Sequence, residues 1–412
     1  MAAELMMRYM LQKNHIYNVA AIAYWSLEIA VASHEDDLGK TTVEMARDKG
    51  YKVEEHQIWT KDGYGITIHR IINESVSSSE GPPVIFGVPL FSESAGFVLQ
   101  DKHNSMGYYC ADQGLDVWLG NNRGSPFGRR HRTLRPQEDA FWDFSIIEHA
   151  IDLRAIVDYT LNFTGFPQTY YVGVSQGSVI ATTLLSMVPS YNSRFALLAF
   201  FGAFRTTKHI AEYTQQIALY FKLFTGGSQK IQSGFKNGPV LTNSGGLSRF
   251  CHLAPRICGF LAESLNYRCV DKFRIDVMLE HFPTGTSVKN MAYYLQLSKP
   301  DAPRLFDYGS VENRRRYGNI THEVTGESGV PPPLKAELIT APIGLYFSHG
   351  DTVTPLKEFQ DLRKGLPNIR YTYEITDQPT YGHVCYVTNR TNDAMYRNFT
   401  EEFKKIPIKK VN

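Results

Sequence analysis

Short runs of apolar residues recur along much of the chain, and stretches of helical character lie between them. The clearest runs are Val84 to Phe86, Leu115 to Leu119, Tyr170 to Val174, Phe195 to Phe201, Ile343 to Phe347 and Ile369 to Ile375. Apolar runs of this length, bounded by polar residues, are typical of buried strands. Their alternation with helices predicts an α/β protein in which a mostly parallel sheet carries helices on both faces.

A pair of antiparallel strands is predicted ahead of this alternation. The segments Val53 to Trp59 and Gly65 to Ile71 are strand-like and flank Lys61-Asp62-Gly63. An Asp-Gly pair between two strand-like segments favours a tight hairpin, because glycine readily adopts the positive φ that such turns require.

The regular spacing breaks between Phe204 and Pro333. About 130 residues separate two expected strands there, which is far too long for a loop inside a compact domain. Helical, aromatic-rich pieces at Tyr213 to Phe224 and Asp276 to Leu279 predict an inserted cap that ends at the stiff Pro331-Pro332-Pro333 segment. The predicted organisation is an N-terminal segment at 1–40, a first core part at 41–203, a helical cap or lid at 204–333 and a second core part at 334–412.

The N-terminal segment has the layout of a targeting sequence. Ile16 to Ala32 is mainly apolar, follows Arg8 and Lys13, and ends in Ala-Val-Ala before an acidic stretch, as in a signal peptide with its cleavage site. Glu28 interrupts the run, and its 17 residues are short for a membrane span. An amphipathic or anchoring helix and an ordinary surface helix are the alternatives. Cleavage would make the protein secreted or lumenal in lysosomes or endomembranes, whereas an anchor would make it membrane-associated.

Two further features bear on the compartment. Five sequons would accept glycans in a secretory protein, at Asn73, Asn162, Asn319, Asn389 and Asn398. Five cysteines are too few and too irregular for a disulfide framework, and they stand at Cys110, Cys251, Cys258, Cys269 and Cys385. The three that cluster allow one local disulfide in an oxidising compartment, and buried free thiols are the alternative. The odd count leaves at least one thiol unpaired.

Composition excludes several classes of protein. Hydrophobic residues make up 43% of the 412 residues and charged residues 20%, the proportions of an ordinary globular protein. Lys plus Arg number 43 against 41 Asp plus Glu. Because no long basic run concentrates positive charge, nucleic acid is not expected as a partner.

A nucleophile motif lies at Gly173-Val174-Ser175-Gln176-Gly177. This G-x-S-x-G follows a predicted strand and precedes a predicted helix at Ser178 to Met187, which is the context of a nucleophile elbow. The glycines permit a turn so sharp that the Ser175 hydroxyl is exposed at the end of the strand. The backbone N–H of Gln176 then faces the position of a developing oxyanion. A structural turn serine is the alternative.

A serine needs a base and an orienting acid to become a nucleophile. Asp351 follows the predicted strand Ile343 to Phe347, and His383 follows the strand Ile369 to Ile375. This order of Ser, acid and His is that of α/β-hydrolases. His349 is the rival base, but it precedes the acid and therefore breaks the order.

Several motifs resemble the acid lipase family, which includes the gastric, lysosomal and fungal steryl-ester lipases. The resemblance runs from about Thr41 to near the C-terminus and is carried by Asp62-Gly63-Tyr64, Ile68-His69-Arg70-Ile71, Asp116 to Gly124, Phe141-Trp142-Asp143-Phe144-Ser145, Tyr171 to Gly177, Arg274-Ile275-Asp276-Val277, Pro283 to Met291 and Asp307-Tyr308-Gly309. It implies an α/β-hydrolase core with a helical lid. It also implies a triad of Ser175, Asp351 and His383, the three residues that the strand-end positions had already indicated.

One stretch departs from the family pattern. Members usually carry His-Gly-Leu after the third strand, whereas this chain has Gly87-Val88-Pro89-Leu90-Phe91-Ser92. Proline has no N–H to donate, so the second oxyanion donor is expected at Leu90 or Phe91, with Phe91 favoured by alignment. Loss of one such donor costs about 10²–10³ in rate. The polar loop Asn121-Asn122-Arg123-Gly124 is kept, as a structural turn or as support for the site.

The sequence therefore predicts a serine hydrolase of lipid carboxylic esters, acylglycerols or steryl esters, that needs no metal or organic cofactor. The aromatic-rich cap would shield the acyl chain and make transient contact with a lipid surface. The altered Pro89 stretch motivates an alternative, a catalytically impaired lipid-binding or scaffold protein. Acyl transfer to an alcohol would use the same triad.

Overall fold

The computed structural model describes residues 37–76, 81–209, 238–240, 245–255, 257–259, 269, 271, 274–298, 303–325, 329–376, 378–389 and 392–410. The chain divides into a unit at Met1–Asp37 and a unit at Leu38–Asn412, and all elements named below belong to the second. The apolar segment at Ile16 to Ala32 and the helical piece predicted at Tyr213 to Phe224 lie outside the described residues. Among the described residues, no helix combines the length and apolar character needed to cross a membrane.

A central sheet organises the second unit. Its strands follow the order β1-β2-β4-β3-β6-β7-β10-β11, and a short strand β5 pairs with β2. Their bounds are β1 (Lys52–Trp59), β2 (Tyr64–Ile72), β3 (Pro83–Gly87), β4 (Asp116–Leu119), β5 (Arg130–His131), β6 (Thr169–Val174), β7 (Phe195–Phe201), β10 (Ile343–Ser348) and β11 (Ile369–Ile375). From β4 to β11 all neighbours are parallel, whereas β2 is antiparallel to β1, β4 and β5. The mostly parallel α/β architecture is confirmed, and so is the antiparallel start.

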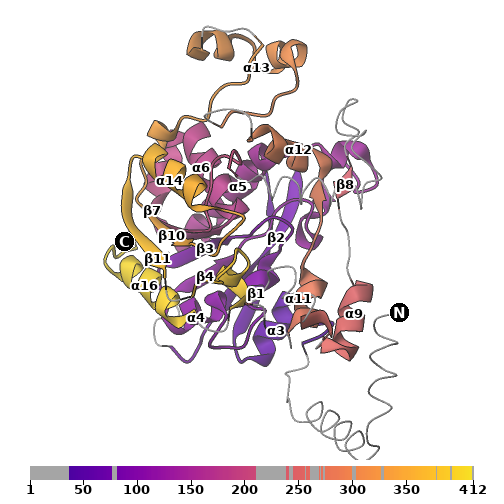
Figure 1. Cartoon of the computed structure of the whole chain (residues 1–412), viewed down its shortest axis with the longest axis vertical. Helices are drawn as coiled ribbons and strands as arrows, with labels where there is room; N and C mark the ends of the chain where they lie inside the picture. The colour runs from indigo at the N-terminus through magenta and orange to yellow at the C-terminus, as the bar shows by residue number, and fades with distance from the viewer. Residues whose placement is uncertain are drawn as a thin grey trace, which may run out of the picture. The chain divides into compact units, whose positions relative to one another are not determined.

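Two layers of helices cover the sheet (Figure 1). One layer contains α5 (Ile146–Thr164), α6 (Gln176–Met187) and α14 (Leu356–Gly365), and the other contains α3 (Thr42–Asp48), α4 (Met106–Asp112) and α16 (Asp393–Lys404). Strand residues alternate between two apolar clusters, so that Ile85 packs in the first whereas Val84 and Phe86 pack in the second. The central strands β6 and β7 are therefore buried along their whole length, which explains their continuous apolar sequence, whereas the edge strand β11 alternates between exposed and partly exposed residues.

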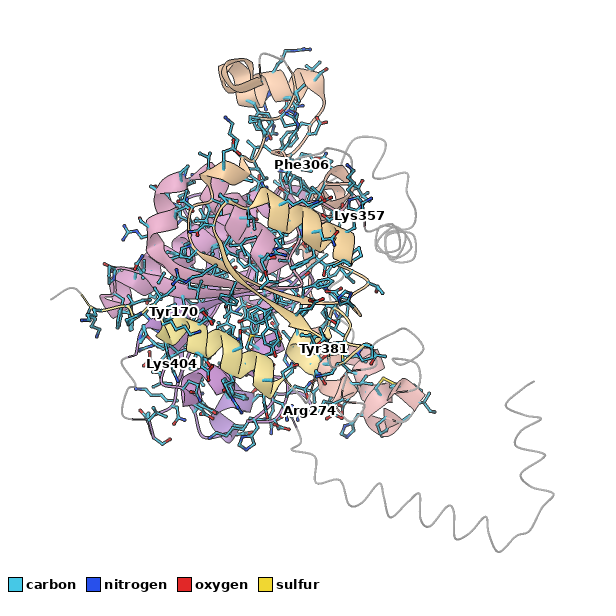
Figure 2. All side chains as sticks on the ribbon, turned by 60° about the vertical axis from the view of Figure 1, so that its left-hand side comes forward. Tyr170, Arg274, Phe306, Lys357, Tyr381 and Lys404 are labelled. Atoms are coloured by element: carbon cyan, nitrogen blue, oxygen red, sulfur yellow. A yellow bond between two sulfur atoms is a disulfide. The ribbon has the colours of Figure 1, made fainter. Side chains whose placement is uncertain are left out.

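Local sequence signals set the ends of the helices. Ser145 and Glu148 form a capping box at the start of α5, and Gly165 ends the helix with a φ of 73°. On the opposite face, Tyr170 of β6 lies against α16 (Figure 2). Its ring stacks on Phe403 with centroids 4.4 Å apart, and its hydroxyl donates to the Phe403 carbonyl at 2.9 Å. This contact fixes the last long helix to the sheet.

The inserted region between β7 and β10 contains helices and one small antiparallel ladder. Its described elements are β8 (Pro239–Val240), α9 (Gly245–Leu253), α11 (Ile275–His281), β9 (Thr286–Ser287), α12 (Val288–Gln296) and α13 (Ser310–Thr325). The helix predicted at Asp276 to Leu279 lies within α11. The pairing of β8 with β9 was not predicted, because strands of two residues show no periodicity.

Short helical turns complete the described connections. They are η1 (Ser94–Phe97), η2 (Pro126–Gly128), η3 (Asp139–Trp142), η4 (Pro189–Arg194), η5 (Ala336–Leu338) and the α-helical turn α15 (Cys385–Thr388). Two of them, η1 and α15, follow the loops that carry Phe91 and His383, and both come close to the candidate site.

Candidate active site

Ser175 lies in a sharp turn between β6 and α6. Its φ of 52° and ψ of −116° place it in a strained backbone region, as expected for a nucleophile elbow. A side chain on Gly177 would overlap the backbone of Gly87 on the neighbouring strand. The glycine at this position therefore permits the close approach of α6 to the sheet. Ser175 as a whole residue is almost fully buried, at 3% exposure.

Asp351 and His383 meet at the same edge of the sheet. His383 Nδ1 lies 2.8 Å from Asp351 Oδ2. Asp351 is buried and also accepts hydrogen bonds from the backbone N–H groups of Val353 and Thr354, both at 2.9 Å, and from the Thr354 hydroxyl. These donors hold the carboxylate in place. His349, the rival base, is exposed and instead pairs with Glu374.

Gly202 brings the serine and the histidine together. The Ser175 N–H donates to the carbonyl of Phe201 at 2.9 Å, directly before Gly202. A Cβ on Gly202 would lie 2.9 Å from Cε1 and 3.0 Å from Nδ1 of His383. The glycine adopts a φ of 55°, a conformation that other residues rarely adopt. The histidine ring therefore packs directly on the turn that follows β7, beside the nucleophile elbow.

The ring nitrogen of His383 that faces away from Asp351 is free to accept a proton. His383 Nε2 is buried and makes no hydrogen bond within the described part of the chain. With Nδ1 donating to a carboxylate, the neutral ring carries its lone pair on Nε2. Hydrogen bonds between a nucleophile and its base are often long before substrate binds.

The loop that follows β3 contains Phe91, which, like Ser175, is a non-glycine residue with positive φ. Phe91 has a φ of 59°, and the Ser92 N–H donates to the Pro89 carbonyl at 3.3 Å. This is a tight turn whose third residue has positive φ, a position usually taken by glycine. Because Gly87 pairs with Gly173 across β3 and β6, the turn begins beside the nucleophile elbow.

Asn121, in the polar loop after β4, holds the same region. Its side-chain oxygen accepts from the Ser94 N–H at 2.8 Å, and its amide donates to the Thr67 carbonyl at 2.9 Å. Ser94 also lies 2.8 Å from His69 Nδ1, and burial lowers the pKa of His69 to about 4. The loop after β4 thus supports the segment that follows Phe91.

Arg123 of the same loop forms a buried ion network. Its guanidinium donates to Asp152 from Nε at 2.8 Å and from Nη2 at 2.6 Å, and to Asp62 from Nη1 at 2.6 Å. Burial raises the pKa of Asp152 to about 6, and Arg123 opposes that shift. Burial, together with the charge of Arg123, lowers the pKa of His149 to about 3. His149 is therefore a neutral ring below the site.

Gln176 joins the nucleophile elbow to the inserted region. Its buried side-chain oxygen accepts from the Tyr294 hydroxyl at 2.9 Å and from the Asn290 amide at 3.0 Å. Both donors lie on α12. The residue whose backbone N–H was predicted as an oxyanion donor is thus oriented by the insertion.

The insertion also contacts the Phe91 loop. The Thr284 N–H donates to the Phe91 carbonyl at 2.7 Å, and His281 Nδ1 lies 2.5 Å from Glu93 Oε1. At the other end of α11, Arg274 Nε donates to the Leu99 carbonyl at 2.9 Å (Figure 2). These contacts hold α11 against the segment that contains η1.

Two disulfides connect four of the five cysteines. Cys251 pairs with Cys258, which is the local bridge that the clustering allowed. Cys269 pairs with Cys385, two residues after His383, and this long-range bond was not predicted. Cys110 is free and buried, so the single unpaired thiol is in the core, where burial raises its pKa.

The fold and the Ser, His and Asp at one sheet edge define the class of α/β-hydrolases. A family model described as a partial alpha/beta-hydrolase lipase region matches residues 42–101, and a model of the alpha/beta hydrolase fold matches residues 95–228. The chain belongs to the acid lipase family, as the motifs had indicated.

Three relatives illustrate this membership. Lipase 1 of Drosophila melanogaster is 31% identical over 87% of this chain and 78% of its own length. Lysosomal acid lipase/cholesteryl ester hydrolase of Macaca fascicularis is 31% identical over 82% of this chain and 84% of its own. Gastric triacylglycerol lipase of Homo sapiens is 30% identical over the same shares.

The sequence missed three groups of residues around the site. Gly202 gave no signal, because a single glycine after a strand is common. Asn290 and Tyr294 lie more than 110 residues from Gln176, and no local pattern connects them. Cys385 was visible as a cysteine, but its partner could not be inferred from spacing.

Proposed function

We propose that Ser175, His383 and Asp351 catalyse the hydrolysis of lipid carboxylic esters through an acyl-enzyme. Membership of the acid lipase family makes the chain a carboxylic ester hydrolase. The observation that carries the assignment of residues is the meeting of three strand-end loops. The Ser175 N–H donates to Phe201, the residue before Gly202, and His383, paired with Asp351, packs against Gly202.

The first half of the reaction acylates the serine. His383 Nε2 removes the proton from the Ser175 hydroxyl while the oxygen attacks the ester carbonyl carbon. Asp351 keeps Nδ1 protonated and stabilises the imidazolium that forms. The tetrahedral oxyanion accepts hydrogen bonds from the backbone N–H groups of Gln176 and Phe91.

Collapse of this intermediate releases the alcohol. His383 returns the proton to the leaving oxygen, and the acyl group remains on Ser175. A water molecule then enters, gives its proton to His383 and attacks the acyl carbonyl. Breakdown of the second tetrahedral intermediate frees the fatty acid and restores the serine.

The substrate class follows from the relatives and from the inserted region. Two relatives are named for triacylglycerol and cholesteryl ester hydrolysis, and we infer acylglycerols or steryl esters for this chain. The segment at 204–333 serves as a lid. Phe250, Leu253 and Ile257, at and beyond the end of α9, are 49%, 84% and 55% exposed, and such residues favour transient contact with a lipid surface.

A secretory route fits the same residues. Disulfides persist in oxidising compartments, and this chain has two of them. The signal-like segment at 1–40 would direct the protein there, to secretion or to a lysosomal or endomembrane lumen. Asn162 on α5 is an exposed sequon position, so it would accept a glycan without disturbing the core.

Labelling by a fluorophosphonate tests the assignment of the triad. The purified protein, with and without mild detergent, should be labelled, because the probe reports any activated serine. Ser175→Ala and His383→Ala should abolish labelling, whereas His349→Ala, the matched control, should keep at least half of the wild-type rate. Loss of labelling in His349→Ala but not in His383→Ala would contradict the proposed base.

A further inference from the structure

We propose that the Cys269–Cys385 disulfide positions His383, so that reduction of this bond lowers the rate of the chemical step. The inference rests on the proposed function of His383 as the base. Cys385 and Cys269 would then be positioning residues, acting through the histidine without touching substrate.

The sulfur of Cys385 contacts the backbone beside the histidine. Cys385 begins the short turn α15 and is completely buried. Its Sγ accepts a hydrogen bond from the Gly382 N–H at 2.9 Å, and Gly382 immediately precedes His383. A shift of Cys385 would therefore move the backbone that carries the ring.

The ring itself has little other support. Among the described residues, Asp351 is the hydrogen-bond partner of the ring, at 2.8 Å. Gly202 bounds it on one side, and the Tyr386 ring meets it edge-on at 6.3 Å. Tyr386 also belongs to α15. This short turn therefore influences the position of the His383 ring and provides one of the side chains that pack against it.

Hydrogen bonds from the core also hold α15, whereas Val384 at its start packs on the apolar cluster of Cys251, Cys258 and Ile275 in the insertion. The Asn392 amide donates to the Cys385 carbonyl at 3.0 Å and accepts from the Tyr381 hydroxyl at 2.8 Å (Tyr381 is labelled in Figure 2). The disulfide adds a covalent tie to the inserted region, 116 residues earlier in the sequence. Through this bond, the insertion restrains the base loop.

Reduction of the bond is ordinary thiol–disulfide exchange. A thiolate of the reductant attacks Cys269, which is less buried than Cys385, and the Cys385 thiolate leaves. The second thiol of a dithiol reductant then displaces Cys269. Two protein thiols form, and the reductant becomes a disulfide, so two electrons are transferred in all.

The second disulfide provides a matched control. Cys251–Cys258 lies in the same inserted region, and both of its residues are buried, but they belong to α9 and the segment after it. Neither residue is covalently bonded to a loop of the candidate triad, and the apolar cluster that the two form with Ile275 contacts the His383 loop only by packing on Val384. Removal of this bond tests the general effect of losing a disulfide in the insertion.

The experiment compares Cys269→Ser/Cys385→Ser with Cys251→Ser/Cys258→Ser in the full-length chain. Folding is checked by circular dichroism, and kcat and KM are measured with a soluble short-chain ester, together with the rate of fluorophosphonate labelling. Because misplacement of a catalytic group by 1 Å can cost 10²-fold, kcat and the labelling rate should fall about 10- to 100-fold in the first variant, with KM within twofold. The control variant should keep kcat within twofold of the wild type.

Reversible reduction provides a second measurement that does not depend on folding of the serine variant. Dithiothreitol should lower kcat of the Cys251→Ser/Cys258→Ser enzyme by the same factor, and reoxidation should restore it. Equal kcat values for the oxidised and reduced forms, with reduction verified by thiol alkylation, would overturn the inference while leaving the triad intact. Absence of labelling in the oxidised wild-type protein would instead overturn the proposed function, and this inference with it.

Discussion

The core and the inserted region contribute different contacts to the loops of the candidate site. In the core, strands and helices bury apolar residues in two continuous clusters, one on each face of the sheet. The described part of the insertion adds apolar residues such as Met291 and Val277 to these clusters. Its polar and covalent contacts with the loops of the site are few, and they lie at Gln176, at Phe91 and Glu93, and at Cys385. Periodic burial therefore determines where the site lies, whereas isolated contacts determine how its loops are oriented.

This difference changes the role expected of the insertion. Each loop that carries a candidate oxyanion donor or the candidate base has a direct contact with it. Asp351, by contrast, is held by Thr354 and Val353, which are its own neighbours in the core. The insertion thus helps to build the site, and a lid would be only one of its functions.

Substitution of two glycines with positive φ, one in the core and one in the insertion, gives the sharpest test of the difference between the two regions. Gly202 in the core has its Cβ direction filled by His383 and Tyr386, whereas Gly309 in the insertion, with a φ of 85°, has nothing within 4 Å. Alanine at either position costs about 1–2 kcal/mol of backbone strain. Gly202→Ala should also displace His383 and lower kcat about 100-fold, while Gly309→Ala should leave kcat unchanged.

Steady-state kinetics and thermal unfolding of both variants would separate the effect of backbone strain on stability from the effect of a displaced His383 on kcat. A loss of kcat in Gly309→Ala as large as that in Gly202→Ala would show that strain anywhere in the chain impairs the site. A Gly202→Ala enzyme with wild-type kcat would show that the loop of His383 can shift while His383 keeps its catalytic position.

Most of the fold could be predicted from the sequence, because buried parallel strands leave continuous apolar runs. Every predicted strand begins and ends within one residue of the observed strand, from Lys52–Trp59 to Ile369–Ile375. The start of α6 at Gln176 lies two residues before its predicted start, because the elbow itself opens the helix. The β8–β9 ladder escaped prediction, since two residues carry no period.

The candidate site was predictable as far as strand ends determine it. Ser175, Asp351 and His383 each follow a strand, and parallel strands place their carboxyl ends at one edge of the sheet. The contacts of Gln176 and Cys385 join segments more than 110 residues apart. These contacts depend on how the insertion packs on the core, and no pattern in a single sequence predicts that packing.

Acid should destabilise the core through its buried histidines. The pKa of His149 is lowered to about 3 by burial, whereas an unfolded histidine titrates near pH 6.5. Below pH 6.5, His149 binds a proton in the unfolded chain but remains unprotonated in the folded core. The contribution of this neutral ring is therefore complete above pH 6.5 and is lost as the pH falls toward 3, at up to about 1.4 kcal/mol per pH unit.

Denaturant titrations between pH 7.5 and 4.5 would measure this loss in the wild type and in His149→Gln. The variant should start less stable at pH 7.5, because a buried ring is lost, but its free energy of unfolding should fall less steeply with acid. Parallel curves for the two proteins would assign the acid sensitivity to other groups, such as His69, whose pKa burial also lowers.

The smallest expected effect separates two neighbouring tyrosines of α12. Tyr294 donates to Gln176 at 2.9 Å, whereas Tyr293 donates to the carbonyl of Arg304 at 2.6 Å, within the insertion. Both rings are buried, so Tyr294→Phe and Tyr293→Phe should each cost about 1 kcal/mol of stability for one lost hydrogen bond. Only Tyr294→Phe should also lower kcat, by a few-fold, because Gln176 keeps Asn290 as its second donor. Equal kcat values in the two variants, at equal stability, would mean that α12 supports the nucleophile elbow without orienting it, and the contact at Gln176 would then belong to packing alone.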